Sequence, residues 1–156
     1  MPDTRELIRE FLRGRRLAVA GVSRGHESAA NPVFRRLRDE GFEVFPVNPR
    51  ATQVEGTACF PDLASVPGPL DGVVIATHPD ASAAVARQAV ALRVPRVWFH
   101  RSLGKGSVSD EAVRTCAEGG VACIVGGCPL MYCGRVDIAH RCLRWWLDRR
   151  GRIRAA

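Results

Sequence analysis

Residues 17–22 read Leu-Ala-Val-Ala-Gly-Val, a continuous apolar run with the length of a β-strand. A strand this apolar is buried on both faces, as strands are in a parallel sheet that helices cover. Similar apolar runs end near Val47, Thr77, His100 and Val125, and segments with helical spacing of apolar residues separate them. Strands that alternate with helices in this way predict an α/β fold with a doubly wound, mainly parallel sheet.

Residues that suit helix ends stand between these strands. Asn31 followed by a proline has the residue types of an N-cap and a first helical turn. Asp80 and Ser109 are expected to cap two later helices in the same way. A further short strand is expected at residues 58–60, between glycine and proline positions that favour turns.

Each end of the chain predicts one more helix. Asp3 and Glu6 have the spacing of a capping box, and an apolar stripe follows them and ends at Gly14. A second amphipathic segment runs over residues 136–149. We therefore expect one domain over residues 1–156, with an N-terminal helix in 1–15, a core in 16–134 and a C-terminal helix in 135–150.

The net charge of +7 is concentrated at the two ends of the chain. Residues 1–16 carry five arginines against three acids, residues 17–134 carry eleven basic against eleven acidic residues, and residues 135–156 carry seven arginines against two aspartates. A nucleic-acid partner would therefore depend on the C-terminal segment. Arginines on solvated helix faces are the simpler explanation, so nucleic acid is the less favoured partner.

Composition also bears on location. No apolar run approaches the roughly 18 residues of a membrane span, and the first residues lack the apolar core of a signal peptide. Without a secretion signal, the six cysteines are best interpreted as reduced thiols. We expect a cytoplasmic protein with no membrane partner.

The loop after the first strand carries the first candidate ligand residues, because ligands of such sheets bind at the carboxyl ends of the strands. Gly21, Ser23 and Gly25 only partly fit the glycine pattern of dinucleotide-binding loops, since a serine replaces the second glycine. The hydroxyl of Ser23 can bond a phosphate oxygen. Asn31 at a helix N-terminus would lie beside free backbone N–H groups, which favour an anion.

The end of the second strand indicates which nucleotide is bound. Enzymes that use NAD usually place an acidic residue there for the ribose hydroxyl, whereas this chain has Asn48, Pro49 and then Arg50. Arginine pairs with phosphate through two hydrogen bonds. The pattern favours a nucleotide with an additional ribose phosphate, such as NADP or coenzyme A.

Several blocks in one order resemble the stand-alone CoA-binding domain proteins, which are similar to the CoA-binding domain of the succinyl-CoA synthetase α subunit. The blocks are Gly21-Val-Ser23, Phe42-Glu-Val-Phe-Pro-Val-Asn-Pro49, Pro69-Leu-Asp-Gly-Val-Val74, Val97-Trp98 and Cys128-Pro129. The resemblance spans about residues 16 to 147. It implies a Rossmann-like fold that binds CoA through its 3′-phosphate and pyrophosphate, with no catalytic residue of its own.

The resemblance also implies where the ligand contacts lie. Gly21, Val22 and Ser23 would lie under the pyrophosphate with Asn31 beside them, and Arg50 would lie near the additional phosphate. The remaining implied contacts are Val47, Asn48 and Pro49 on the adenosine side, Thr77 and Pro79 on the opposite wall, and Trp98 and Cys128 as candidates that could equally belong to the core. The chain departs from the family pattern at residues 28–30 and 99–104.

Other chemistry is less well supported by the residues. Cys128, Cys133, His140 and Cys142 have a spacing that fits no compact zinc site, so no metal is expected. We expect His140 to be buried and bonded to a carbonyl group. Cys128 is the one thiol that could meet a CoA thiol and form a mixed disulfide with it.

Residues 21–25 also match the letters Gly-x-Ser-x-Gly, but a hydrolase elbow follows several strands and not the first one. The sequence thus predicts non-catalytic binding of CoA or an acyl-CoA, as a carrier, sensor or regulatory module. An NAD(P)-binding oxidoreductase or redox-sensing domain is the first alternative, and nucleic-acid binding through the basic C-terminal segment is the second. The apolar face of the C-terminal helix is expected to pack either on its own domain or across a homodimer.

Overall fold

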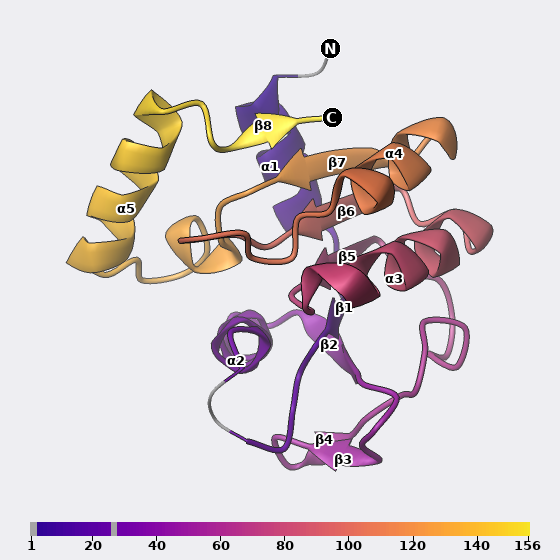
Figure 1. Cartoon of the computed structure of the whole chain (residues 1–156). Coiled ribbons are helices and arrows are strands. Elements are labelled where there is room, and N and C mark those ends of the chain that lie inside the picture. Colours follow the sequence, from indigo (N-terminus) through magenta and orange to yellow (C-terminus); the bar gives the residue numbers. More distant parts are fainter. Residues whose placement is uncertain (1–2, 26–27) are drawn as a thin grey trace.

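A central six-stranded sheet organises the molecule (Figure 1). The computed structural model describes residues 3–25 and 28–156. The strand order of the sheet is β2-β1-β5-β6-β7-β8. The first five of these strands are parallel to one another, and β8 is antiparallel to β7. The strands are β1 Arg16–Ala20, β2 Glu43–Val47, β5 Gly72–Ile75, β6 Arg96–Phe99, β7 Ala122–Val125 and β8 Arg154–Ala155. The prediction of a doubly wound, mainly parallel, Rossmann-like sheet is confirmed.

Helices cover both faces of the sheet. They are α1 Thr4–Arg13, α2 Ala30–Asp39, α3 Pro79–Ala91, α4 Asp110–Glu118 and α5 Ile138–Arg149, with a short 3₁₀ turn, η1, at Pro129–Met131. Leu17 and Val19 of β1 pack into the core under α1, α2 and α5, while Ala18 and Ala20 pack under α3 and α4. This alternation follows from the two-residue period of a strand and explains why β1 must be apolar throughout.

The order of the strands reverses between β1 and β5. From β1 the chain crosses through α2 to β2 on one side, whereas β5, β6 and β7 follow one another on the other side. Gly21 stands at this point with φ +104°, and a Cβ there would lie 2.5 Å from the carbonyl oxygen of Ala76. Only glycine allows the two loops to approach so closely, and the crevice that they leave is where ligands of such sheets bind.

A small hairpin lies outside the main sheet, beside the end of β2. Its strands are β3 Gln53–Val54 and β4 Thr57–Ala58, and its turn residues Glu55 and Gly56 both have positive φ. The expected strand at residues 58–60 is therefore a hairpin strand, and Phe60 forms only an isolated bridge with Val47. The backbone N–H of Asn48 donates to the Phe60 carbonyl at 2.9 Å and holds the hairpin in place.

Two predicted helix starts are wrong, and two are confirmed, the first of these being Asp3, which caps α1 and accepts from Arg5 N at 3.3 Å. Helix α2 begins at Ala30 with Ala29 as its N-cap, so Asn31 lies inside the first turn. Helix α3 begins at Pro79, and its N-cap is His78 rather than Asp80, because a proline without an N–H suits the first helical position. Ser109 caps α4 as expected and accepts from Ala112 N at 3.3 Å.

The start of α1 and the last strand of the chain meet at one end of the molecule (Figure 1). Strand β8 pairs with β7, and the backbone N–H of Ala155 donates to Thr4 Oγ1 at 3.1 Å. The C-terminal helix begins only at Ile138, after its N-cap Asp137, and residues 150–156 form a turn and a strand rather than a free tail. No helix in the described part of the chain is both long and apolar enough to cross a bilayer.

Candidate ligand-binding site

Two cavities lie side by side along the carboxyl edge of the sheet. The first has a volume of about 530 Å³ and lies over the ends of β1, β2 and β5. The second has a volume of about 620 Å³ and lies over the ends of β5, β6 and β7, reaching α5. Ala76, Thr77 and His78 line both cavities, so the two adjoin, and together they form a groove at the position where the strand order predicts a ligand.

The first cavity brings together six of the residues that the sequence singled out. They are Gly21, Val47, Asn48, Pro49, Arg50 and Thr77. The side chain of Asn48 connects the two loops of this wall, because its amide nitrogen donates to Val22 O at 2.9 Å and its oxygen accepts from Arg50 N at 2.9 Å. Asn48 therefore shapes the wall through bonds within the protein.

The side chain of Asn31, in the first turn of α2, holds the loop after β1 in place. Its amide oxygen accepts from Ser23 N at 3.0 Å, and its nitrogen donates to Ser23 O at 2.8 Å and to Glu55 Oε1 at 2.7 Å. The residue is 1% exposed. The expected place of Asn31 beside a pyrophosphate is thus corrected to one inside the protein, where it joins the loop, α2 and the hairpin.

Several other predicted contacts also lie outside the two cavity walls in the described structure. Ser23 donates its hydroxyl to Gly25 O at 2.8 Å, and Val22 is fully buried. Pro79 begins α3, and neither cavity is lined by it. Trp98 is fully buried, with its indole N–H donating to Gly126 O at 2.9 Å and its ring 5.4 Å from that of Phe11. Trp98 therefore belongs to the core.

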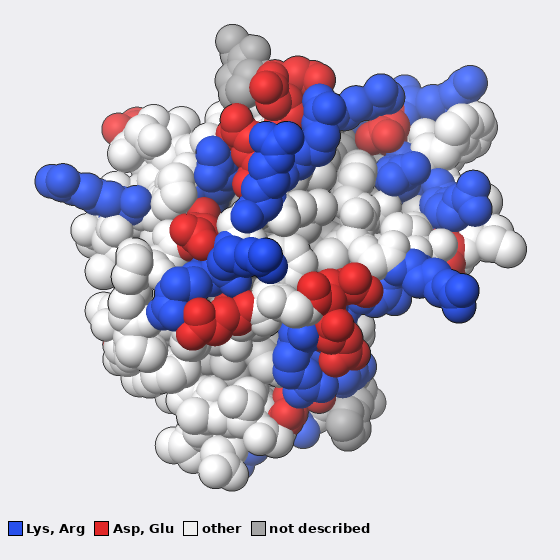
Figure 2. Space-filling model, turned by 180° about the vertical axis from the view of Figure 1, so that it is seen from behind, with Lys and Arg blue, Asp and Glu red and all other residues white. Residues whose placement is uncertain are grey.

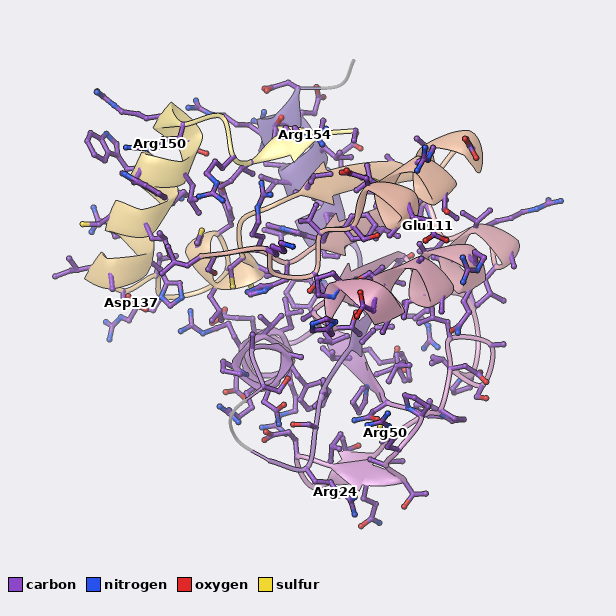
Figure 3. The ribbon with its side chains drawn as sticks, viewed as in Figure 1. Arg24, Arg50, Glu111, Asp137, Arg150 and Arg154 are labelled. Carbon is purple, nitrogen blue, oxygen red and sulfur yellow. The ribbon has the colours of Figure 1, made fainter. Side chains whose placement is uncertain are left out.

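The sequence reasoning missed a second arginine at the first cavity. Arg24 and Arg50 line the same hollow, which adjoins the first cavity through Pro49, Arg50 and Pro61. Both arginines are exposed, and Figure 3 shows them on the same side of the molecule, near β3 and β4. The signal was an arginine in the loop of residues 21–25, but only the path of that loop brings it near the end of β2.

The second cavity has mainly apolar walls and contains buried titratable groups. His100 is 8% exposed, and burial together with the nearby His140 lowers its pKa to about 4. Cys128 is 2% exposed, and burial raises the pKa of its thiol to about 11. Because the thiolate is the reactive form of cysteine, this environment disfavours a mixed disulfide at Cys128.

His140 differs from its prediction. Its side chain is 30% exposed, so it is not buried, and its Nδ1 lies 2.6 Å from Oδ2 of Asp137 instead of bonding a carbonyl group. Asp137 also accepts from His140 N at 2.9 Å as the N-cap of α5, and these bonds lower the pKa of its carboxyl group. The cap thus fixes both the helix end and the imidazole ring.

Metal ligands do not gather in the part of the chain that is described. Within residues 3–25 and 28–156, no group of three His, Cys, Asp or Glu side chains could hold a metal ion. All six cysteines are free, and five of them are buried. The site is thus a groove between loops with a basic end, mainly apolar walls and three histidines, His78, His100 and His140.

Comparison with protein families identifies this architecture. A family model described as a CoA binding domain matches residues 15–134. The chain belongs to the CoA binding domain family. This membership confirms the resemblance that the sequence blocks indicated.

Relatives of this CoA binding domain occur both as small proteins and as parts of larger ones. The Bacillus subtilis protein YneT is 27% identical over 139 residues, covering 89% of this chain and 95% of YneT. A hypothetical protein from Pyrococcus horikoshii OT3 has a solved structure that superposes with a TM-score of 0.74 at 25% identity, covering 82% of this chain and 87% of that one. An ADP-forming acetate–CoA ligase II subunit alpha from Pyrococcus furiosus is 32% identical over 66 residues, 42% of this chain and 14% of the ligase subunit.

Proposed function

We propose that the first cavity binds the 3′-phospho-ADP part of coenzyme A or of an acyl-CoA. The observation that carries this proposal is the pair Arg24 and Arg50 beside the cavity at the switch point of the sheet. The family to which the chain belongs supports the choice of ligand. The side chains that could do chemistry in this cavity are engaged in holding loops, as Asn48 and Ser28 are, which favours a carrier, sensor or regulatory module over an enzyme.

The walls suit the separate parts of that ligand. Pro49 and Pro61 offer apolar surface to an adenine ring, and the two guanidinium groups beside them can pair with a 3′-phosphate. Helix α2 begins where the cavities meet, since Ser28 lines the first and Ala29 lines the second. A helix N-terminus and the bare Cα of Gly21 allow a pyrophosphate to approach the backbone there.

The first alternative, an NAD(P)-binding oxidoreductase or redox-sensing domain, uses the same observation differently. Two arginines could also pair with the 2′-phosphate of NADP. Calorimetric titration of the protein with CoA, NADP and NAD separates the two ligand classes. We expect CoA to bind at least about tenfold more tightly than NADP, and NAD to bind weakest. Tighter binding of NADP or NAD than of CoA would overturn the proposal.

The second alternative, nucleic-acid binding, rests on the basic C-terminal segment. The guanidinium of Arg149 lies 4.6 Å from the ring centre of Trp145, and that of Arg150 lies 4.8 Å from that of Trp146. On the face seen in Figure 2, arginines alternate with carboxylates and form no single basic surface. Arg149 and Arg150 stack on aromatic rings, so we consider nucleic acid a less favoured partner than CoA.

Two further proposals concern the state of the protein in the cell. The six free cysteines favour a reducing compartment, and we propose the cytoplasm. We also propose a homodimer through α5. Only Leu147 of this helix is fully buried, whereas Ile138 is 76% and Trp145 is 58% exposed.

A further inference from the structure

The second cavity is the part of the groove that the 3′-phospho-ADP part of the ligand leaves unused. It opens from the first cavity across Ala76, Thr77 and His78, and it ends at Cys128, His100 and His140. An extended chain that leaves the pyrophosphate at the start of α2 would pass these shared residues and enter it. The pantetheine arm of CoA is such a chain, and it ends in a thiol.

The far wall of this cavity carries the imidazole ring of His140, which a carboxylate holds through one of its nitrogens. The carboxylate of Asp137 can only accept, and it lies 2.6 Å from Nδ1 of His140, so it holds the ring proton on that nitrogen. The other nitrogen, Nε2, is then left as an acceptor in the neutral ring. Figure 3 shows Asp137 at the beginning of α5, where it fixes the ring from the end of the helix.

The other titratable groups of the cavity do not offer the same acceptor. His78 is the N-cap of α3, and its Nδ1 accepts from Asp80 N at 3.4 Å, so the proton of the neutral ring lies on Nε2; its side chain is 76% exposed. His100 is buried beneath the loop of residues 101–107. The backbone N–H of Ser107 closes this loop by donating to the His100 carbonyl at 2.8 Å. Cys128 is a buried thiol, and the carboxylate of Asp137 faces His140 from its own helix end.

Building on the proposed function, we infer that the second cavity holds the pantetheine arm of CoA and that Nε2 of His140 accepts the hydrogen of its thiol. Asp137 is a positioning residue, because it acts through His140. An acylated or alkylated sulfur has no hydrogen to donate, so the protein distinguishes free CoA from its S-substituted forms.

The direct test compares CoA with S-methyl-CoA, a thioether that differs from CoA by one methyl group on the sulfur. In calorimetric titrations, the wild-type protein is expected to bind CoA about three- to tenfold more tightly, which is the range of one net hydrogen bond. His140→Phe keeps an aromatic ring without the acceptor, and the ratio of the Kd values for S-methyl-CoA and CoA is expected to fall to about one. His140→Gln, whose amide oxygen can accept, retains part of the preference, and Asp137→Asn reduces it. Arg141→Phe, on the exposed side of the same helix, leaves it unchanged.

A second measurement locates the arm without relying on any variant. Imidazole signals in ¹H–¹⁵N spectra of the wild-type protein are followed during titration with CoA and with adenosine 3′-phosphate 5′-diphosphate, which lacks the arm. CoA is expected to shift the His140 signals, and the nucleotide alone is expected to leave them in place. CoA that binds without shifting them, equal affinity for CoA and S-methyl-CoA, or a preference that persists in His140→Phe each overturn this inference alone. Failure of both CoA and the nucleotide to bind overturns the proposed function as well.

Discussion

Gly21 shows how one residue fixes the place of the site. Its positive φ and the 2.5 Å between a built Cβ and the Ala76 carbonyl leave no room for a side chain. Gly21→Ala is expected to lower the free energy of unfolding by about 2 kcal/mol or more, because both the backbone and the neighbouring loop must shift. Urea denaturation measures this change.

Gly25 provides the matched control in the same loop. Among the described residues, a Cβ there would meet no atom within 4 Å. Gly25→Ala should therefore change the free energy of unfolding by less than about 0.5 kcal/mol. Equal stabilities for the two variants would contradict the account of the switch point.

His100 gives the folded protein a characteristic dependence on pH. Its pKa falls from an ordinary 6.5 to about 4 on burial, so the unfolded chain takes up a proton that the folded chain refuses. Stability is therefore fully present above pH 6.5 and is lost as the pH falls toward 4. Between pH 7 and 4.5 we expect His100 to account for a loss of about 2 kcal/mol.

Urea denaturation of the wild type and of His100→Gln at these two pH values isolates this contribution. The variant is expected to lose less stability on acidification than the wild type does, whatever its stability at pH 7. Parallel losses in both proteins would show that His100 is protonated in the folded state.

At the scale of elements, the side chain of Asn31 joins the loop after β1, helix α2 and the β3–β4 hairpin through three hydrogen bonds. Asn31→Ala leaves the partly buried backbone groups of Ser23 without these partners and is expected to cost about 2 kcal/mol in the free energy of unfolding. Asn31→Asp keeps the acceptor for Ser23 N but places a second carboxylate beside Glu55, so it should also destabilise. Chemical denaturation measures both, and wild-type stability in Asn31→Ala would contradict this role.

The sequence was sufficient to predict elements that have a long apolar pattern and insufficient for those fixed by tertiary contacts. The buried strands and the amphipathic helices follow from periodicity, and the carboxyl-edge position of Gly21, Asn48 and Arg50 follows from the strand order. Strand β8 has two residues and no pattern of its own, so only its pairing with β7 defines it. Asn31 has the chemistry of an N-cap, but its partner is a loop that the sequence could not place.

The same limit applied to the site residues. The resemblance left Trp98 as either a ligand contact or a core residue, and strand alternation directs its side chain into the core beneath α1. Arg24 was missed because an exposed arginine in a loop carries no distinguishing pattern. Arg24 lies near Arg50 only because of the path that residues 22–25 take in the folded protein.

At the scale of the whole molecule, α5 carries two of the exposed large apolar side chains of the described residues, Ile138 and Trp145. A homodimer through this helix predicts a sedimentation mass of twice the 17.0 kDa of one chain at micromolar concentration. Trp145→Glu, which places a charge on the exposed face, is expected to return the mass to that of one chain. A wild-type protein that sediments as a single chain at these concentrations would contradict the dimer.

The groove joins a basic end at Arg24 and Arg50 to a far end at His140, and the account of its function depends first on the basic end. The most direct measurement is the ratio of Kd values for dephospho-CoA and CoA, in the wild type and in the Arg24→Ala/Arg50→Ala double variant. Arg114→Ala, an exposed arginine on α4, is the control. We predict that loss of the 3′-phosphate weakens wild-type and control binding at least about tenfold, and that the ratio approaches one in the double variant. Equal affinities of the wild type for CoA and dephospho-CoA would contradict the account.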